Sequence, residues 1–167
     1  MISQSEVRWI GASTAAAMLS LDQLTKQWAL ALLGEPGGHH ALPGPIDLTL
    51  VFNQSNAFGM VPVAGDFSRW ALVVLNLGVA AVLTWVLWRR RSSRVTAAGM
   101  GFVIAGAVGN AVDRIRYGAV VDFVDASAAG FPWVFNVADA ALDVGIVLLL
   151  LGAVSGNREG GLRSPAR

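Results

Sequence analysis

Four long apolar runs divide this chain of 167 residues, and polar positions gather between them. The runs cover residues 9–33, 70–88, 95–112 and 137–154. Each approaches the roughly 20 residues that a helix needs to cross a bilayer. Hydrophobic residues make up 54% of the chain and charged residues 14%, fewer charges than an average soluble protein has. The pattern predicts an all-α membrane protein with four transmembrane helices in one domain, residues 1–155, followed by a disordered cytoplasmic tail, residues 156–167.

Arginines flank these runs unevenly, and the asymmetry predicts an orientation. Lys and Arg in short flanking loops stay on the cytoplasmic side of a membrane. Such residues precede the first run, join the second to the third and follow the fourth, at Arg8, Arg89, Arg90, Arg91, Arg94, Arg158, Arg163 and Arg167. Both termini are therefore expected in the cytoplasm. A cleaved signal peptide is the alternative for the first run, but that run is too long and is interrupted by Asp22 and Lys26.

Net charge and cysteine content remove several classes of function. The formal net charge is +1, and the arginines between the second and third runs are explained by orientation, so no nucleic-acid partner is expected. The chain has no cysteine, which excludes disulfides, thiolate metal sites and a cysteine nucleophile. No cofactor and no metal site are predicted.

The longer outer connection contains one strand pattern. Ile46, Leu48, Leu50 and Phe52 alternate with a more mixed set of residues, which places these four on one face. A small β-rich sheet is therefore expected on the outer membrane surface, with residues 53–59 as its turn. We expect it to act as an extracytoplasmic cradle for a substrate.

Two carboxylates are the first candidates for chemistry. Asp122 and Asp139 end segments so apolar that an unpaired carboxylate there is costly. Such a group persists only if it is paired, protonated or useful. Two carboxyl groups close together split their pKa values, so that one is protonated and one ionised near neutral pH. That combination suits an aspartyl hydrolase.

Further polar residues crowd the connection between the third and fourth runs. Asn110, Asp113 and Asn136 lie at or near it, with Arg114. Taken alone, Asn110 is better explained by helix packing, because small residues every four positions up to Gly109 allow a second helix to approach closely. The crowding of so many polar groups around one short connection indicates a site.

Five short motifs stand in order and between the expected spans: Asp22-Gln-Leu-Thr-Lys26, Asn53-x-x-x-Ala-Phe-Gly59, Gly109-Asn-Ala-Val-Asp-Arg114, Val120-Val-Asp-Phe123 and Phe135-Asn-Val-Ala-Asp139. Together they resemble the motif set of the lipoprotein signal peptidase, or signal peptidase II, family. The resemblance implies a four-helix aspartyl peptidase of the bacterial inner membrane. It implies that the substrate is a diacylglyceryl-modified prolipoprotein, cut just before the lipid-modified cysteine. Membrane lipids are the other expected partners, and a monomer is expected.

Position by position, the resemblance makes Asp122 and Asp139 the catalytic dyad. It gives binding or supporting roles to the polar residues around them, which are Asn53, Asn110, Asp113, Arg114, Asn136, Asp22 and Lys26. Asp22 and Lys26 also share a helix face at i and i+4, so mutual neutralisation is an equal alternative for this pair.

Two positions depart from the family's pattern. Ser55-Asn56 stands where the family has Gly-Ala, which alters the turn beside Asn53. Asp143 lies one turn beyond Asp139 in the fourth run. There it is expected to be buried, mostly protonated and not catalytic.

Other mechanisms fit these residues less well than general acid–base hydrolysis through a water between two aspartates. A Ser–Lys dyad would use Lys26 as base and Ser20 or Ser55 as nucleophile, but Ser20 and Lys26 lie on roughly opposite faces of a helix. A small proton-coupled transporter or channel subunit would need polar groups at several depths, whereas residues 146–151 are wholly apolar.

Overall fold

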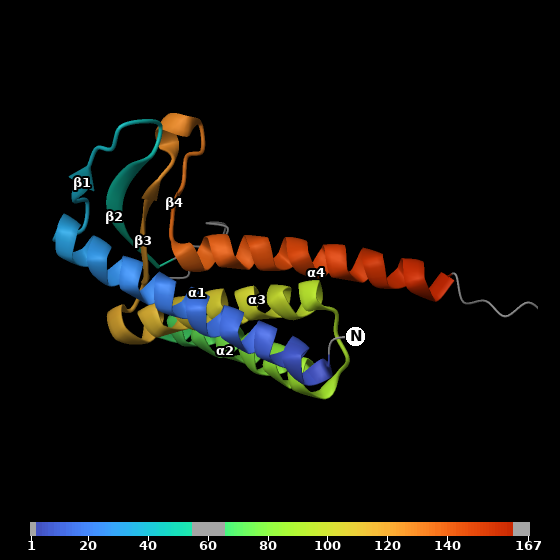
Figure 1. The fold of residues 1–167 in the computed structure, drawn as a ribbon. Coiled ribbons are helices and arrows are strands. Elements are labelled where there is room, and N and C mark those ends of the chain that lie inside the picture. Colours follow the sequence, from blue (N-terminus) through green and yellow to red (C-terminus); the bar gives the residue numbers. More distant parts are fainter. Residues whose placement is uncertain (1–2, 55–65, 162–167) are drawn as a thin grey trace, which may run out of the picture.

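Long helices lie side by side, and a small sheet stands at one end of them (Figure 1). The computed structural model describes residues 3–54 and 66–161. The helices are α1 (Gln4–Leu33), α2 (Asp66–Arg89), α3 (Arg94–Tyr117) and α4 (Val137–Gly161), with a short 3-10 turn, η1 (Ser127–Ala129). The strands are β1 (His39–His40), β2 (Asp47–Asn53), β3 (Val120–Asp125) and β4 (Val134–Phe135). The prediction of a mostly helical chain with a small sheet is confirmed.

Within the described ranges, three helices are long and apolar enough to cross a membrane: α2, α3 and the part Val137–Ser155 of α4. Helix α1 has 30 residues but is not among them, since Asp22, Gln23, Lys26 and Gln27 make its second half more polar. Its span therefore stays a prediction. Helix α4 continues to Gly161, so the tail boundary expected at residue 156 falls within a helix.

Helix α3 lies at the centre of the bundle and packs against the other three helices. Small residues allow the close approach. A Cβ at Gly101 would overlap the backbone of Gly11 in α1, and a Cβ at Gly145 in α4 would lie 2.9 Å from the carbonyl oxygen of Gly99. Backbone contact of this kind is a common mode of helix packing in membranes. The small-residue stripe of α3 is thus the face that receives α1.

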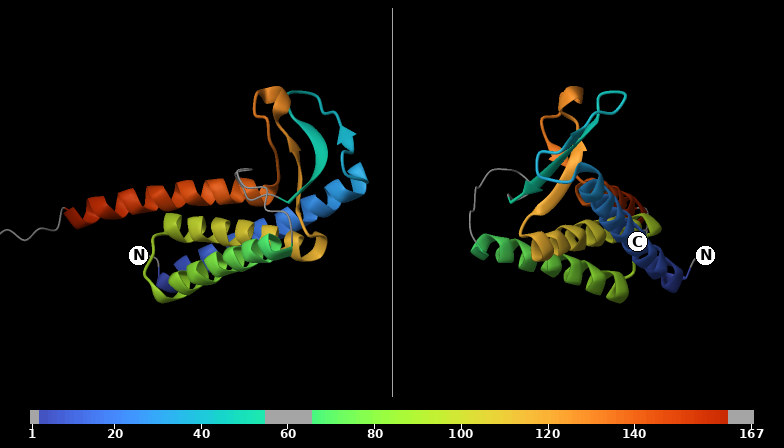
Figure 2. Two further views of the ribbon diagram at one scale, coloured as in Figure 1. Left: turned by 180° about the vertical axis from the view of Figure 1, so that it is seen from behind. Right: turned by 90° about the vertical axis from the view of Figure 1, so that its left-hand side faces the viewer.

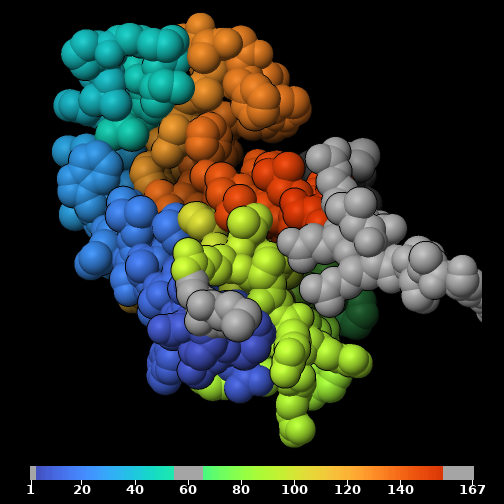
Figure 3. Space-filling view, turned by 45° about the vertical axis from the view of Figure 1, so that its right-hand side comes forward, coloured from blue at the N-terminus to red at the C-terminus, as the bar shows by residue number. Residues whose placement is uncertain are grey.

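The sheet is antiparallel, with strand order β1-β2-β3-β4. Strand β2 is the strand expected from the alternating pattern, and Leu48 and Leu50 on its apolar face are buried. Figure 2 shows the sheet rising from the end of the bundle opposite the N-terminus. In the space-filling view of Figure 3, β1 and β2 in teal and β3 and β4 in orange form one lobe above the helices. The turn expected at residues 53–59 lies outside the described residues from Ser55 onward.

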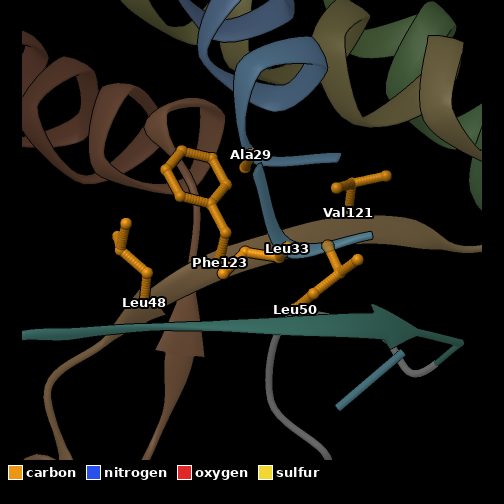
Figure 4. Packing of buried hydrophobic residues seen from close by; sticks show 6 residues of the cluster. All are labelled: Ala29, Leu33, Leu48, Leu50, Val121 and Phe123. Carbon is orange, nitrogen blue, oxygen red and sulfur yellow. The ribbon is translucent and has the colours of Figure 1, made fainter. Parts of the chain in front are cut away.

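A small apolar core joins this sheet to the bundle (Figure 4). It contains two residues of α1, two of β2 and two of β3: Ala29, Leu33, Leu48, Leu50, Val121 and Phe123. Burial of each large side chain contributes about 1.5–3 kcal/mol. Successive side chains of a strand point to opposite faces, so Asp122 points away from the face that Val121 and Phe123 present to this core. The core therefore fixes the strand that carries the first candidate aspartate.

Candidate active site

Asp122 is held at both carboxylate oxygens by asparagine amides. Asn53 Nδ2 in β2 donates to Oδ2 at 2.9 Å, and Asn136 Nδ2 donates to Oδ1 at 2.6 Å. The Asp122 side chain is only 1% exposed. Burial, and secondly the negative charge of Asp139, raise the pKa of Asp122 to about 7, although both amides act in the opposite direction. Asp122 therefore exchanges its proton near neutral pH.

Asp139 lies in the first turn of α4, where the free backbone N–H groups of the helix favour a negative charge. Asn110 Nδ2 donates to its Oδ1 at 2.9 Å. Asn136 and Asp139 also form a capping box: Asp139 N donates to Asn136 Oδ1 at 2.9 Å, and Asn136 N donates to Asp139 Oδ2 at 3.4 Å. The spacing Asn-x-x-Asp before an apolar run was a readable signal for this cap.

Asn136 connects the two aspartates. Its Nδ2 group donates to Asp122 at 2.6 Å and to Asn110 Oδ1 at 3.3 Å, while its oxygen caps α4 beside Asp139. The Asn136 side chain is fully buried. One amide thus ties a strand of the sheet to the N-terminus of a helix and to the central helix.

Lys26 lies behind the two aspartates in a buried ionic cluster. Its Nζ is 3.0 Å from Asp22 Oδ2, 2.7 Å from Asp113 Oδ2 and 3.3 Å from Asn110 Oδ1. An ammonium has three hydrogens to donate, and these three oxygens use them all. These contacts occupy Lys26 with three oxygen acceptors that are not serine hydroxyls. Ser20 is exposed on α1, and Ser55 lies outside the described residues, so no described contact pairs Lys26 with either serine.

Arg114 supplies a second cation close to the aspartates. Its side chain is buried, Nη1 donates to the Asn110 carbonyl at 3.4 Å, and its charge acts on Asp139 and Asp122. Sequence reasoning missed Arg69. Its Nε donates to the Arg114 carbonyl at 2.7 Å, so a residue of α2 satisfies the free end of α3 beside the site.

Asp143 corrects one expectation. It is exposed rather than buried, on the side of α4 that turns away from α3, where Val144 and Val147 are exposed as well. Four residues advance a helix by slightly more than one turn, and this rotation moves Asp143 out of line with Asp139. The expectation that Asp143 is buried inside the protein is therefore wrong.

The structure brings together all the residues to which the resemblance gave a role. They are Asp22, Lys26, Asn53, Asn110, Asp113, Arg114, Asp122, Asn136 and Asp139. In the part of the chain that the structure describes, no group of three or more His, Asp or Glu residues could hold a metal ion. The chemistry available is that of two carboxyl groups with amide and cationic neighbours.

Long apolar helices with a buried cluster of carboxylates and amides at one end fit a helical membrane enzyme. The sequence profile of signal peptidase (SPase) II matches residues 14–155. A lipoprotein signal peptidase of Caulobacter vibrioides is 44% identical over 146 residues, which are 86% of this chain and 85% of the relative. One of Burkholderia mallei is 38% identical over 143 residues, 85% of this chain and 84% of the relative. The chain belongs to the signal peptidase II family, and the resemblance inferred from the five motifs is confirmed.

Two solved structures described as bacterial membrane enzymes share the fold. One has a TM-score of 0.77 and 22% sequence identity, and the match covers 94% of both chains. The other has a TM-score of 0.71 and 24% identity, covering 84% of this chain and 90% of its own. The family identifies the chain as a peptidase, and none of these comparisons supports the transporter alternative.

Proposed function

We propose that this chain is an aspartyl endopeptidase that removes signal peptides from bacterial prolipoproteins, with Asp122 and Asp139 as its catalytic dyad. The observation that carries the proposal is the meeting of these two carboxyl groups, one from β3 and one from α4, on either side of the buried Asn136 amide. The shared name of the two relatives supports the prolipoprotein substrate. The cut falls just before the diacylglyceryl-modified cysteine, and the hydrolysis uses no cofactor.

The dyad works by general acid–base catalysis with one shared proton. The ionised carboxylate removes a proton from a water molecule, whose oxygen attacks the scissile carbonyl carbon. The protonated carboxyl polarises the carbonyl oxygen, and a proton then passes to the amine that leaves as the C–N bond breaks. The pKa of Asp122 near 7 supports a single proton on the pair at neutral pH. The two carboxyl groups titrate as a unit.

The surrounding residues orient this pair. Asn53, Asn136 and Asn110 hold three of its four carboxylate oxygens by their amide N–H groups, which sets the direction of the remaining lone pairs. Arg114 offsets the negative charge that the pair carries when ionised. The dyad is therefore preorganised before a peptide arrives.

Tryptophan positions support four spans rather than three. All six tryptophans are exposed, as expected for side chains at the two interfaces of a membrane. Trp9 and Trp28 lie 19 residues apart in α1, about 28 Å along its axis, and Trp70 and Trp88 in α2 lie 18 residues apart, about 27 Å. Both spacings match a hydrocarbon core of about 30 Å. The rings of Trp9 and Trp88 also touch, with centroids 5.9 Å apart, which sets the two helices at one level.

Charge supports the orientation with both termini in the cytoplasm of a bacterial inner membrane. The hydrogen bond from Ser92 N to Gln4 Oε1, at 3.1 Å, joins the start of α1 to the loop between α2 and α3. Arginines cluster at this end of the bundle, and the dyad lies at the other. By the positive-inside rule the arginine end is cytoplasmic, so the dyad lies near the extracytoplasmic face.

The sheet then rests at the outer membrane surface as a cradle. Phe131 and Trp133, more than half exposed, stack edge to face with centroids 4.8 Å apart. Trp133 precedes the first residue of α4 by four positions, at most about 14 Å of extended chain. Aromatic rings at that distance from the end of a span reach the headgroup layer. The enzyme acts as a monomer on substrates that arrive through the lipid.

A lipoprotein reporter tests the proposal. Cells that lack their own signal peptidase II are given a reporter with a lipid-modified cysteine, with or without this chain, and the electrophoretic mass of the reporter is followed. We expect mature reporter with the wild-type chain and the uncut, lipid-bearing precursor with Asp122→Asn. A second reporter with serine in place of that cysteine controls for unrelated cleavage. Equal processing with and without the chain would overturn the proposal.

A further inference from the structure

The Lys26 ammonium contacts three oxygen acceptors. Each acceptor begins a short series of hydrogen bonds, here called a branch, that ends at one of the two reactive aspartates or at the residue before it. The acceptors are Asp113 Oδ2 at 2.7 Å, Asp22 Oδ2 at 3.0 Å and Asn110 Oδ1 at 3.3 Å. Lys26, Asp22 and Asp113 are each 1% exposed, so water does not compete for these contacts. In such surroundings a charge-assisted hydrogen bond has a well-defined geometry.

The Asp113 branch fixes the strand that carries Asp122. The same Oδ2 atom that contacts Lys26 accepts a hydrogen bond from the backbone N–H of Val121 at 3.1 Å. Val121 is the residue immediately before Asp122. Its N–H lies inside a fully buried part of β3, so Asp113 both satisfies it and sets the position of the strand relative to α3.

The Asp22 branch fixes the helix that carries Asp139. Asp22 Oδ1 accepts the backbone N–H of Ala138 at 2.9 Å, and Ala138 is the residue immediately before Asp139. The carboxylate fits here because residue 109 of α3 has no side chain. A Cβ at Gly109 would overlap Asp22 Oδ2.

The Asn110 branch reaches Asp139 itself. Lys26 is a donor only, so the Asn110 oxygen must face it, and Asn136 Nδ2 also donates to that oxygen at 3.3 Å. The Asn110 amide is thereby oriented with its Nδ2 toward Asp139 Oδ1, at 2.9 Å. Without the lysine, the amide could turn and present an oxygen to the carboxylate.

We propose that Lys26, with Asp22 and Asp113, is a positioning device that sets the separation of the two reactive carboxyl groups by holding the backbone N–H that precedes each of them. This rests on the proposed function, since it assigns these three residues a part in the dyad's chemistry. The device acts through geometry. A displacement of about 1 Å between reacting groups is enough to slow an enzyme about 100-fold.

Two isosteric variants separate geometry from charge. Asp22→Asn and Asp113→Asn each remove one negative charge beside Lys26. In Asp22→Asn the two carboxylate oxygens serve different donors, Lys26 and Ala138 N, so an amide loses one branch in either orientation. In Asp113→Asn one oxygen can keep both Lys26 and Val121 N, and the amide NH2 then faces only Gln23. We expect the kcat of Asp22→Asn to fall about 100-fold and that of Asp113→Asn less than about tenfold, with KM within about threefold in both.

A third variant displaces the Asp22 carboxylate without removing any polar group. Gly109→Ala displaces Asp22, whereas its control Gly78→Ala, in α2, meets nothing within 4 Å. Two quantities are measured on folded protein in detergent: kcat for a lipopeptide substrate, and the carboxyl titration of Asp122 by infrared difference spectroscopy. We expect Gly109→Ala to lower kcat at least 30-fold and to move the titration midpoint of Asp122 by at least half a pH unit, since only spacing has changed. Gly78→Ala should change neither.

The outcomes divide clearly. A merely structural role lowers the thermal midpoint but leaves kcat per folded molecule and the Asp122 titration unchanged, and that result would overturn the proposal. Equal losses in Asp22→Asn and Asp113→Asn would overturn it too, because they point to charge alone. If Gly109→Ala does not fold, the two isosteric variants decide. The proposed function fails separately, if the wild-type chain does not cut the substrate.

Discussion

Asn136 donates a hydrogen bond of 2.6 Å to Asp122, although the two residues belong to a helix cap and a strand 14 positions apart. The same side chain accepts the backbone N–H of Asp139 at 2.9 Å. The Asn136 side chain thus caps α4 and also contacts Asp122. The positions of the two aspartates are therefore linked through one side chain. We expect any change at residue 136 to act on the stability of α4 and on the proposed dyad at once.

The two aspartates are expected to be equally essential. Asp122→Asn and Asp139→Asn each keep the size of the side chain and remove one carboxyl group from the pair. We expect each to lower cleavage at least about 1,000-fold, and the double variant to be no worse, because groups that act as a unit have non-additive effects. Cleavage of a purified lipopeptide, with membrane insertion checked in parallel, measures this.

Asp143→Asn is the matched control for that pair. It is the same chemical change one helical turn along α4, at an exposed side chain away from α3. We expect wild-type cleavage. If Asp143→Asn were inactive while Asp139→Asn still cut, the assignment of the dyad would be displaced by one turn.

The pH dependence of cleavage is expected to report the Asp122 carboxyl. Its pKa is raised to about 7, mainly by burial, so kcat/KM should fall as the pH rises above 7 and the pair loses its shared proton. Asn53 donates to the ionised form of Asp122 and so lowers its pKa. In Asn53→Ala the pKa rises, and the falling limb moves to higher pH by about one unit.

The control for this shift is Asn76→Ala, which removes an amide from α2, outside the proposed site. In Asn76→Ala the falling limb of the kcat/KM profile should stay at the wild-type pH, even if the stability of the variant changes. A limb that stays in place in Asn53→Ala, or moves to lower pH, would contradict the assignment of that limb to Asp122.

Reagents against serine, cysteine and metal-dependent peptidases are expected to leave cleavage intact. The chain has no cysteine, and Lys26 donates all three of its hydrogens to oxygen acceptors. Ser20→Ala should likewise retain full turnover. Loss of turnover in correctly folded Ser20→Ala would restore the Ser–Lys mechanism.

The apolar junction between sheet and bundle is expected to carry a large share of stability. Leu50 is fully buried there, and Leu50→Ala should cost about 2–5 kcal/mol, with lower cleavage because β3 loosens with β2. Leu42→Ala, at a side chain 39% exposed, is the control and should have a small effect. Thermal unfolding in detergent, followed by circular dichroism, compares the two.

The helices could be predicted from the sequence because their apolar content is dense and continuous. Hydropathy placed the end of the third run at residue 112, yet α3 continues through Asp113 and Arg114 to Tyr117. Those polar residues are buried against other polar groups, which a count of apolar residues does not detect. Strand β3 was missed for a related reason: its first four residues are all buried, so no alternation marks it.

The sequence indicated which polar residues gather near the two aspartates, but not how they are connected. Residues Lys26 and Asp113 are 87 positions apart, and nothing in the local pattern pairs them rather than Lys26 with Asp22 alone. The case of Asp143 is the converse. Its place one turn from Asp139 suggested a shared environment, but the residual rotation of the helix put it on an exposed face.

The proposed dyad takes one residue from strand β3 and one from helix α4, and this has a consequence for synthesis in the cell. Asp139 in α4 follows Asp122 in the sequence, so a growing chain contains Asp122 without its proposed partner until α4 has been synthesised. On the proposed assignment, a chain that ends before α4 cannot hydrolyse a peptide bond.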